Sequence, residues 1–153
     1  MAMKNPLEIL YRATTYRVFL PGGYAELRIG QASEVLSNWL ETSGVQCFAI
    51  ITAYNPGSRL LAAALNAERQ SQLECDLLEG NYEPYAGENV PDDESGLLEE
   101  SCFVPDILLE DARALAEDYG QTAIVFGGDN GIPELVWIEK TDRASETANE
   151  EEQ

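Results

Sequence analysis

Alternating apolar and polar positions near the start of the chain predict a β-hairpin. Residues 16–20 and 25–29 place apolar side chains at every second position, and Pro21-Gly22-Gly23 supplies turn residues between them. A period of two is typical of strands with one face buried and the other exposed. We therefore expect a hairpin that packs on the core through one face.

The segments on either side of this hairpin carry the signals of helix ends. Residues 6–12 follow Asn5, a suitable N-cap, and begin with Pro6, whose fixed φ suits the first helical position. After the hairpin, Ser33 precedes an apolar stripe with helical spacing, and Gly44 follows that stripe. The pattern thus predicts one helix before the hairpin and one after it.

A mostly apolar run predicts a buried strand at residues 47–54. Because the run does not alternate, both faces of this strand should be covered, which places it in the interior of the sheet. Asn55 and Pro56 then provide an N-cap and a first helical residue for a helix that extends to about Leu78. A core strand is therefore predicted to lead directly into the N-terminus of a helix.

The next part of the chain is predicted to hold a long loop, a strand and a helix. Residues 79–98 mix glycine, proline, asparagine and acids, and a loop of this length is commonly functional or disordered. Residues 101–104 are a predicted short strand. Asp106 is the predicted N-cap of a helix with a regular apolar stripe that ends at Gly120.

A second hairpin and an acidic tail complete the prediction. Residues 122–126 and 134–139 are expected strands joined by a glycine-rich turn, and residues 141–153 carry no apolar anchor beyond alanine. We predict an α+β fold with a single domain at 1–140 and a disordered acidic tail at 141–153. The domain should contain a mixed β-sheet of about five to six strands with three to four helices packed on it.

The charge of the chain excludes some partners. Its 153 residues include 28 Asp and Glu against 9 Lys and Arg, a formal net charge of −19. Such a surface repels phosphate backbones and anionic lipids, so we expect neither nucleic acid nor membrane as a partner. The sequence shows no signal-peptide pattern and no stretch near the roughly 18 apolar residues of a transmembrane helix, which predicts a cytoplasmic protein.

The chemistry available to the chain is narrow. It has no histidine, and its cysteines, Cys47, Cys75 and Cys102, are isolated. We therefore expect no metal site, no cofactor and no Ser-His or Cys-His nucleophile, and we interpret the cysteines as free thiols within the core.

Several segments together resemble a known family. They are Thr52–Ser58 (TAYNPGS), Asn66, the pair Glu99-Glu100, and Tyr119-Gly120-Gln121 leading into the following apolar strand. The chain up to about Ile138 is similar to a bacterial family catalogued as domain of unknown function 3293. The resemblance implies a shared fold and a shared site, but no activity.

The corner between the central strand and its helix is the first candidate site. Thr52 and Ser58 offer hydroxyls and Asn55 an amide, and free N–H groups at a helix start favour an anionic group. The alternative is that Asn55 and Ser58 merely cap the helix and satisfy those N–H groups themselves.

Three further candidate residues lie outside the corner. Asn66 is either solvated or, if buried, contacts a ligand or braces the Asn55 turn. Glu100, with Glu99 beside it, is a candidate acid/base, an ion-pair partner for an arginine, or a surface residue. Gln121 either contacts a ligand or only binds loop carbonyls.

Three hypotheses for function follow. The favoured one is a non-catalytic domain that binds a small polar or anionic ligand or a protein partner through Thr52, Asn55, Ser58, Asn66, Glu100 and Gln121. The second is a small enzyme with Glu100 as acid/base, favoured if that carboxylate is buried without a cation and disfavoured if it points into solvent. The third is an acidic interaction protein or nucleic-acid mimic, which needs a continuous face of carboxylates. The sequence does not decide whether the protein is an enzyme.

Overall fold

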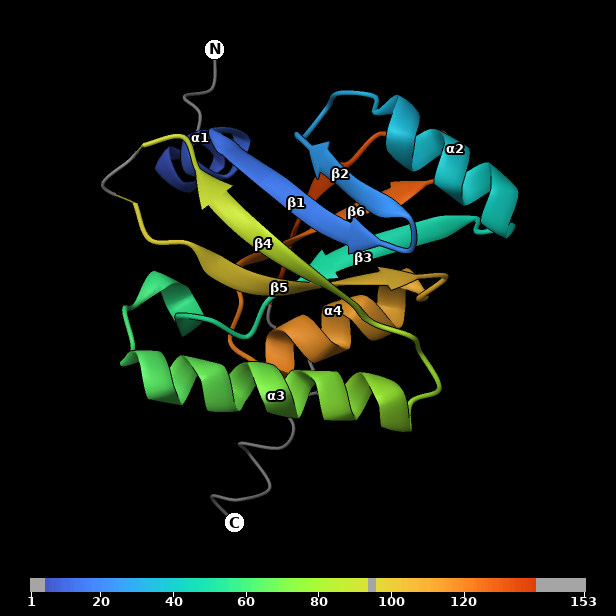
Figure 1. Ribbon diagram of the computed structural model, residues 1–153. Helices are drawn as coiled ribbons and strands as arrows, with labels where there is room; N and C mark the ends of the chain where they lie inside the picture. The colour runs from blue at the N-terminus through green and yellow to red at the C-terminus, as the bar shows by residue number, and fades with distance from the viewer. Residues whose placement is uncertain (1–4, 94–95, 140–153) are drawn as a thin grey trace.

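The computed structural model describes residues 5–93 and 96–139, which form one curled sheet with helices on both of its faces (Figure 1). The strands are β1 (Thr14–Leu20), β2 (Gly23–Leu27), β3 (Cys47–Ile51), β4 (Tyr85–Pro91), β5 (Glu99–Pro105), β6 (Ala123–Gly128) and β7 (Glu134–Trp137). The helices are α1 (Pro6–Arg12), α2 (Glu34–Ser43), α3 (Ala63–Glu79) and α4 (Leu109–Asp118), with a 3-10 turn, η1 (Pro56–Ser58). The predicted α+β class is therefore confirmed.

The sheet differs from the prediction in size and direction. Its strand order is β2-β1-β4-β5-β3-β6-β7, so the described residues form seven strands rather than five to six. Every neighbouring pair is antiparallel, so the predicted mixed sheet is wrong. The antiparallel order depends on β4, which inserts between the N-terminal hairpin and β5 and gives both of them an antiparallel neighbour.

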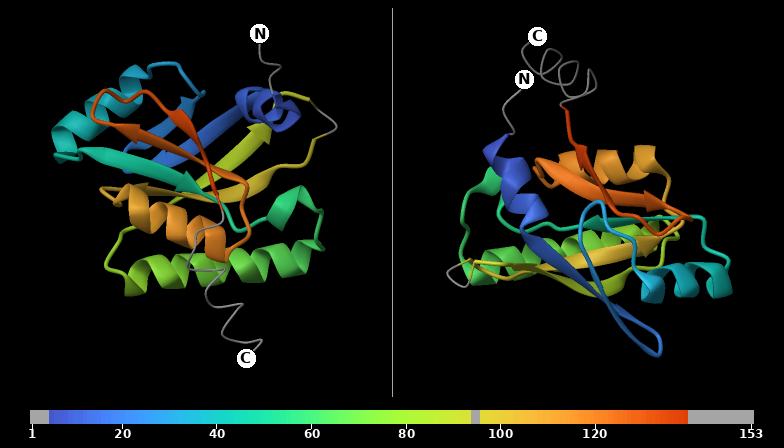
Figure 2. Two further views of the ribbon diagram at one scale, coloured as in Figure 1. Left: turned by 180° about the vertical axis from the view of Figure 1, so that it is seen from behind. Right: turned by 90° about the horizontal axis from the view of Figure 1, so that it is seen from above.

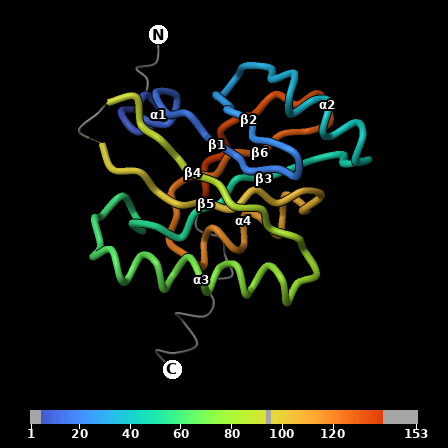
Figure 3. The backbone as a smooth tube through the Cα atoms, in the orientation of Figure 1, coloured from blue at the N-terminus to red at the C-terminus, as the bar shows by residue number. Residues whose placement is uncertain are grey.

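The strand β4 lies inside the segment 79–98 that the sequence predicts as a loop, and Figure 3 traces it between β1 and β5. Its polar residues show no clear alternation, so nothing local marks it as a strand. Gly87 fits there because a Cβ at this position would lie 2.8 Å from the Ser101 Oγ and 2.9 Å from the Arg17 carbonyl oxygen. The neighbours on both sides, rather than the segment itself, specify this strand.

The prediction that β3 lies in the sheet interior is confirmed. It pairs with β5 on one side and β6 on the other, and its residues are buried from Phe48 to Ile51. Phe48 and Ile50 pack with the side chains of α2, whereas Ala49 and Ile51 pack with those of α3 and α4. Figure 2 shows the same division, with α3 and α4 together on one face of the sheet.

Helix ends that depend on local residues follow the prediction. The Asn5 side chain accepts a hydrogen bond from the Leu7 N–H, and the Ser33 side chain accepts one from the Leu36 N–H. Gly44 ends α2 in the left-handed conformation, with φ at 69°. Both predicted N-caps and the predicted C-terminal glycine of α2 are confirmed.

Two other helix starts do not follow it. The predicted helix at 56–78 begins only at Ala63, because Gly57 and Ser58 adopt positive φ and break the helical path. The N-cap of α4 is Leu108 rather than Asp106, whose carboxylate instead accepts the Gln46 N–H at 2.8 Å. In each case a contact or conformation outside the helix decides where it begins.

The predicted acidic tail at 141–153 lies outside the described residues. Within the part of the chain that the structure describes, no helix has the length and apolar character needed to cross a bilayer.

Candidate functional site

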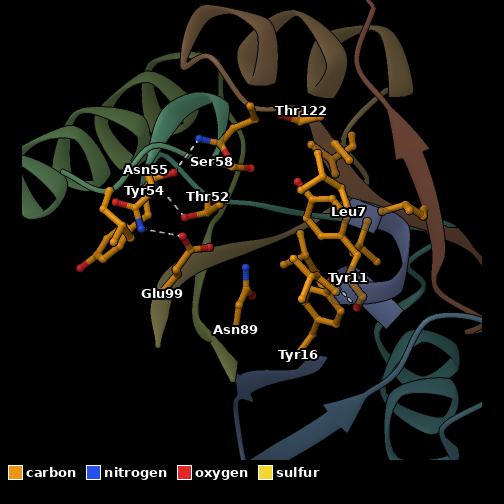
Figure 4. Close-up of a pocket in the computed structure, with 18 residues that line it drawn as sticks. Leu7, Tyr11, Tyr16, Thr52, Tyr54, Asn55, Ser58, Asn89, Glu99 and Thr122 are labelled. Carbon is orange, nitrogen blue, oxygen red and sulfur yellow. Dashed lines mark hydrogen bonds between the residues drawn. The ribbon is translucent and has the colours of Figure 1, made fainter. Parts of the chain in front are cut away.

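A pocket of about 190 Å³ lies at the end of β3, on the face of the sheet that α1 covers. One wall is apolar and includes Leu7 and Leu10 from α1 and Leu135 from β7. The opposite wall is polar and carries Asn55 and Glu99, as Figure 4 shows. Such a combination of apolar surface with a few polar groups is typical of small-molecule sites.

The structure brings most of the predicted site residues to this pocket. Thr52, Asn55, Ser58 and Gln121 line it. Asn66 is buried with 4% exposure and contacts Asn55. Glu100, by contrast, is exposed and does not line the pocket.

Asn55 and Asn66 form a buried amide pair. The Asn66 Oδ1 accepts the Asn55 N–H at 2.9 Å, and the Asn66 Nδ2 donates to the Asn55 Oδ1 at 2.8 Å. The same Asn55 oxygen accepts the Leu61 N–H at 2.9 Å. Asn66 therefore braces the corner, and the alternative of a solvated Asn66 is wrong. Asn55 organises this loop instead of capping a helix.

The predicted anion site at the corner is not present. The Gly57 N–H donates to the Gly120 carbonyl at 2.8 Å, and the N–H groups of Ser58 and Arg59 donate to carbonyls of the corner itself. With the Asn55 and Leu61 N–H groups also bonded to side-chain oxygens, the corner offers no row of free donors. An anionic ligand therefore lacks the groups that were expected to hold it.

The Gly120-Gln121 step packs directly against this corner. The Gln121 Nε2 donates to the Tyr54 carbonyl at 3.0 Å, and Gly120 accepts the Gly57 N–H. A Cβ on Gly120 would lie 2.8 Å from the Pro56 Cβ, and its φ is 69°. Gln121 thus binds loop carbonyls, as one alternative predicts, while also lining the pocket.

Arg69 forms hydrogen bonds to both the corner segment and the segment that leads into Gly120-Gln121. Its Nε donates to the Ala53 carbonyl at 2.9 Å, its Nη2 donates to the Tyr119 carbonyl, and its guanidinium lies 5.6 Å from the centre of the Tyr119 ring. The side chain therefore bonds to backbone oxygens, and it forms no ion pair with Glu99 or Glu100. One sequence signal could have found it, because Arg69 lies one helical turn after Asn66 and faces the same way.

Glu99 is the carboxylate of the pocket. Its Oε2 accepts a hydrogen bond from the Asn55 Nδ2 at 2.8 Å (Figure 4). Burial raises the pKa of Glu99, and the hydrogen bond from Asn55 offsets part of that rise. Among the described residues that line the pocket there is no lysine or arginine. The side chain therefore has the environment that the second functional hypothesis requires of Glu100.

Strand register places Glu99 in a row of polar side chains. Tyr16 of β1 lies opposite Asn89 of β4, and Asn89 lies opposite Glu99 of β5. All three line the pocket, and the Asn89 side chain points toward the Glu99 carboxylate (Figure 4). The Asn89 Oδ1 is buried without a hydrogen-bond partner. A buried unpaired acceptor is uncommon in native structures.

The tyrosines near Glu99 share its electrostatic environment. The pKa of Tyr11 is raised by burial and then by the charge of Glu99. The pKa of Tyr16 is also raised, first by burial and then by Tyr11 and Glu99. Burial again raises the pKa of Tyr54, with Glu100 and Glu99 contributing. The pocket is therefore a region of negative potential in which a further negative charge is unfavourable.

We expect Glu99→Gln to raise the free energy of unfolding at pH 7. The folded state raises the pKa of Glu99, so it binds this proton more tightly than the unfolded chain does. The associated stability is fully present below the unfolded glutamate pKa, near 4.3, and is lost as pH rises through the higher folded value. Glutamine removes that loss while keeping an oxygen for Asn55, so the advantage of the variant should shrink as pH falls toward 4.

Urea unfolding from pH 4 to pH 8 measures this difference. Glu100→Gln is the control, because it removes one negative charge from the exposed neighbour. Parallel stability–pH curves for Glu99→Gln and wild type would show that burial does not shift this carboxylate.

The comparisons with known proteins confirm the resemblance over part of the chain. Residues 51–124 match the model of a family described as "Protein of unknown function (DUF3293)". That segment runs from the end of β3 into β6 and contains the polar wall of the pocket, whereas α1 and β1 lie outside it. No curated protein and no solved structure matches the chain. Residues 51–124 of this chain are therefore similar to the family of proteins of unknown function DUF3293.

Proposed function

We propose that this protein binds a small organic ligand in the pocket at the end of β3. The observation that supports this most is the Glu99 carboxylate, which is half-buried in a pocket whose described lining contains no basic residue. Keeping a carboxylate in such a place costs folding free energy. A ligand that hydrogen-bonds to it would offset that cost. The apolar wall of α1 and β7 would hold the remainder of the ligand.

A role in catalysis is the second candidate, with Glu99 as acid/base in place of Glu100. Its raised pKa is the specific observation in favour, because a carboxyl group acts best as acid and base when its pKa is near the working pH. A cysteine nucleophile has less support. Burial raises the pKa of Cys47, and it raises that of Cys102 to about 12, so both thiols stay protonated. We rank the nucleic-acid mimic last, because a pocket is not what that role requires.

The pocket can be tested by closing its mouth. Purified protein would be screened against metabolite pools by thermal unfolding, where a ligand at 100 times its dissociation constant stabilises by about 2.7 kcal/mol. Leu10 lines the pocket and is 63% exposed, so Leu10→Trp should reduce access without disturbing the core. Ile9 is the matched control, since it is 55% exposed on the same helix but does not line the pocket.

The expected result is a stabilising compound that acts on wild type and Ile9→Trp but at least ten-fold more weakly on Leu10→Trp. A compound that stabilises both tryptophan variants equally binds elsewhere and contradicts the proposal. Mass spectrometry of the compound after incubation separates the two candidate functions. If wild type converts the compound and Glu99→Gln does not, the result supports an enzyme. If the compound is unchanged by wild type, the result supports a binding protein.

A further inference from the structure

We propose that the ligand is an organic cation, a protonated amine carried on a small apolar body. This inference rests on the binding function proposed above and specifies the chemical class of the ligand. It follows from the groups that remain unused around Glu99 and from the nature of the surfaces that face it.

The hydrogen-bonding capacity of Glu99 is the first argument. An ionised carboxylate accepts about four hydrogen bonds through its two oxygens. In the described part of the chain, Asn55 donates to this carboxylate, and it contacts only Oε2. A ligand rich in N–H donors suits this end of the pocket, whereas a ligand that only accepts does not.

The aromatic side chains opposite Glu99 are the second argument. Tyr11 and Tyr16 lie across the pocket from Asn55 and Glu99 (Figure 4). Aromatic rings attract a cation through their negative faces, and the attraction increases when the cation is desolvated. A positive head between these rings and the carboxylate would interact favourably with both, and an anionic head would be repelled by Glu99.

The size and walls of the pocket exclude other cations and large ligands. Calcium and magnesium sites are usually built on one or more carboxylates plus other oxygen ligands, and Glu99 is the single carboxylate among the described residues that line the pocket. The volume of about 190 Å³ is below the roughly 300–1,000 Å³ of sites for drug-sized molecules, so the ligand is small. Leu7, Leu10 and Leu135 supply an apolar wall for its body.

Matched probes that differ only in the head group test this inference. Phenethylamine, 2-phenylethanol and 3-phenylpropanoate carry the same ring with a cationic, neutral or anionic head, and hexylamine, 1-hexanol and heptanoate form a second series with a linear body. Calorimetric titration of wild type, Glu99→Gln, Glu100→Gln and Leu10→Trp would give the dissociation constants.

We expect at least one amine to bind wild type ten-fold or more tightly than its neutral and anionic counterparts. Glu99→Gln should weaken the binding of that amine ten-fold or more, because the substitution keeps the shape of the side chain and removes its charge. Glu100→Gln should leave the affinity within two-fold of the wild-type value. Leu10→Trp should lower the affinity, because the larger side chain restricts access to the pocket.

The two proposals fail in different ways. Equal affinity of an amine for wild type and Glu99→Gln overturns the cation inference, as does tighter binding of a neutral or anionic counterpart. In both cases, weaker binding of the compound to Leu10→Trp would still support binding in the pocket. If no amine and no metabolite pool shows binding that depends on Leu10, both proposals are overturned.

Discussion

Asn55→Ala is expected to lower the free energy of unfolding by about 3 kcal/mol, because each buried polar group left without a partner costs about 1–3 kcal/mol. The Asn55 Oδ1 holds the Leu61 N–H and the Asn66 Nδ2, and its Nδ2 donates to Glu99. Alanine removes all three bonds at once. It also places a residue less tolerant of the left-handed conformation at a φ of 45°, which adds about 1 kcal/mol.

The chain offers a matched control for the backbone part of this effect. Asn81 also adopts a left-handed conformation, with φ at 68°, but it is exposed. Asn81→Ala should therefore lose only about 1 kcal/mol, the conformational cost alone. Denaturant unfolding measures both variants. Similar losses at the two positions would show that the amide pair contributes little to stability.

The pairing with Asn66 predicts how the effects combine. Asn55 and Asn66 share two hydrogen bonds, one through the Asn55 backbone and one through its side chain. In Asn55→Ala the side-chain bond is already lost, so adding Asn66→Ala should cost less than it does in wild type.

Elements with ends fixed by their own residues are predictable from sequence. Asn5 and Pro6 define the start of α1, and Ser33 and Gly44 define the ends of α2, because each of these residues acts through its own backbone or a neighbouring N–H. The buried strand β3 is also predictable, since its apolar run needs cover on both faces.

Features that depend on distant segments are not predictable in this way. β4 is a strand because β1 and β5 lie on either side of it, and its own polar sequence carries no period. The late start of α3 has a local cause instead, because Gly57 and Ser58 adopt positive φ and the Asn55 side chain holds the Leu61 N–H in a loop.

The site follows the same division. Thr52, Asn55, Ser58 and Gln121 can be singled out from sequence, and all four line one pocket. The choice between Glu99 and Glu100 depends on which face of β5 each occupies, which requires the register with β4. Tyr11 and Asn89 reach the pocket through tertiary packing, and no local pattern separates them from other tyrosines and asparagines.

Arg69→Met should be the other strongly destabilising change, with an expected loss of about 3 kcal/mol. Hydrogen bonds to a charged group contribute about 1.5–3 kcal/mol each, and the Arg69 guanidinium makes two, to the carbonyls of Ala53 and Tyr119. Methionine keeps most of the apolar stem, so the loss reports on these bonds rather than on packing. Denaturant unfolding with Arg59→Met as the control gives the comparison, because Arg59 is exposed.

The position of Arg69 extends the consequence of that change to the pocket. Ala53 precedes the corner and Tyr119 precedes the Gly120-Gln121 step, so the guanidinium fixes the two segments that carry the polar wall. Arg69→Met should therefore weaken the binding of any ligand whose affinity depends on Leu10. The affinity is measured at a temperature where the variant remains folded. Arg69→Lys should show an intermediate effect, because an ammonium lacks the planar fork that reaches both carbonyls. An unchanged affinity in Arg69→Met would mean that the corner holds its shape without this residue, and that the Asn55–Asn66 pair alone positions the polar wall.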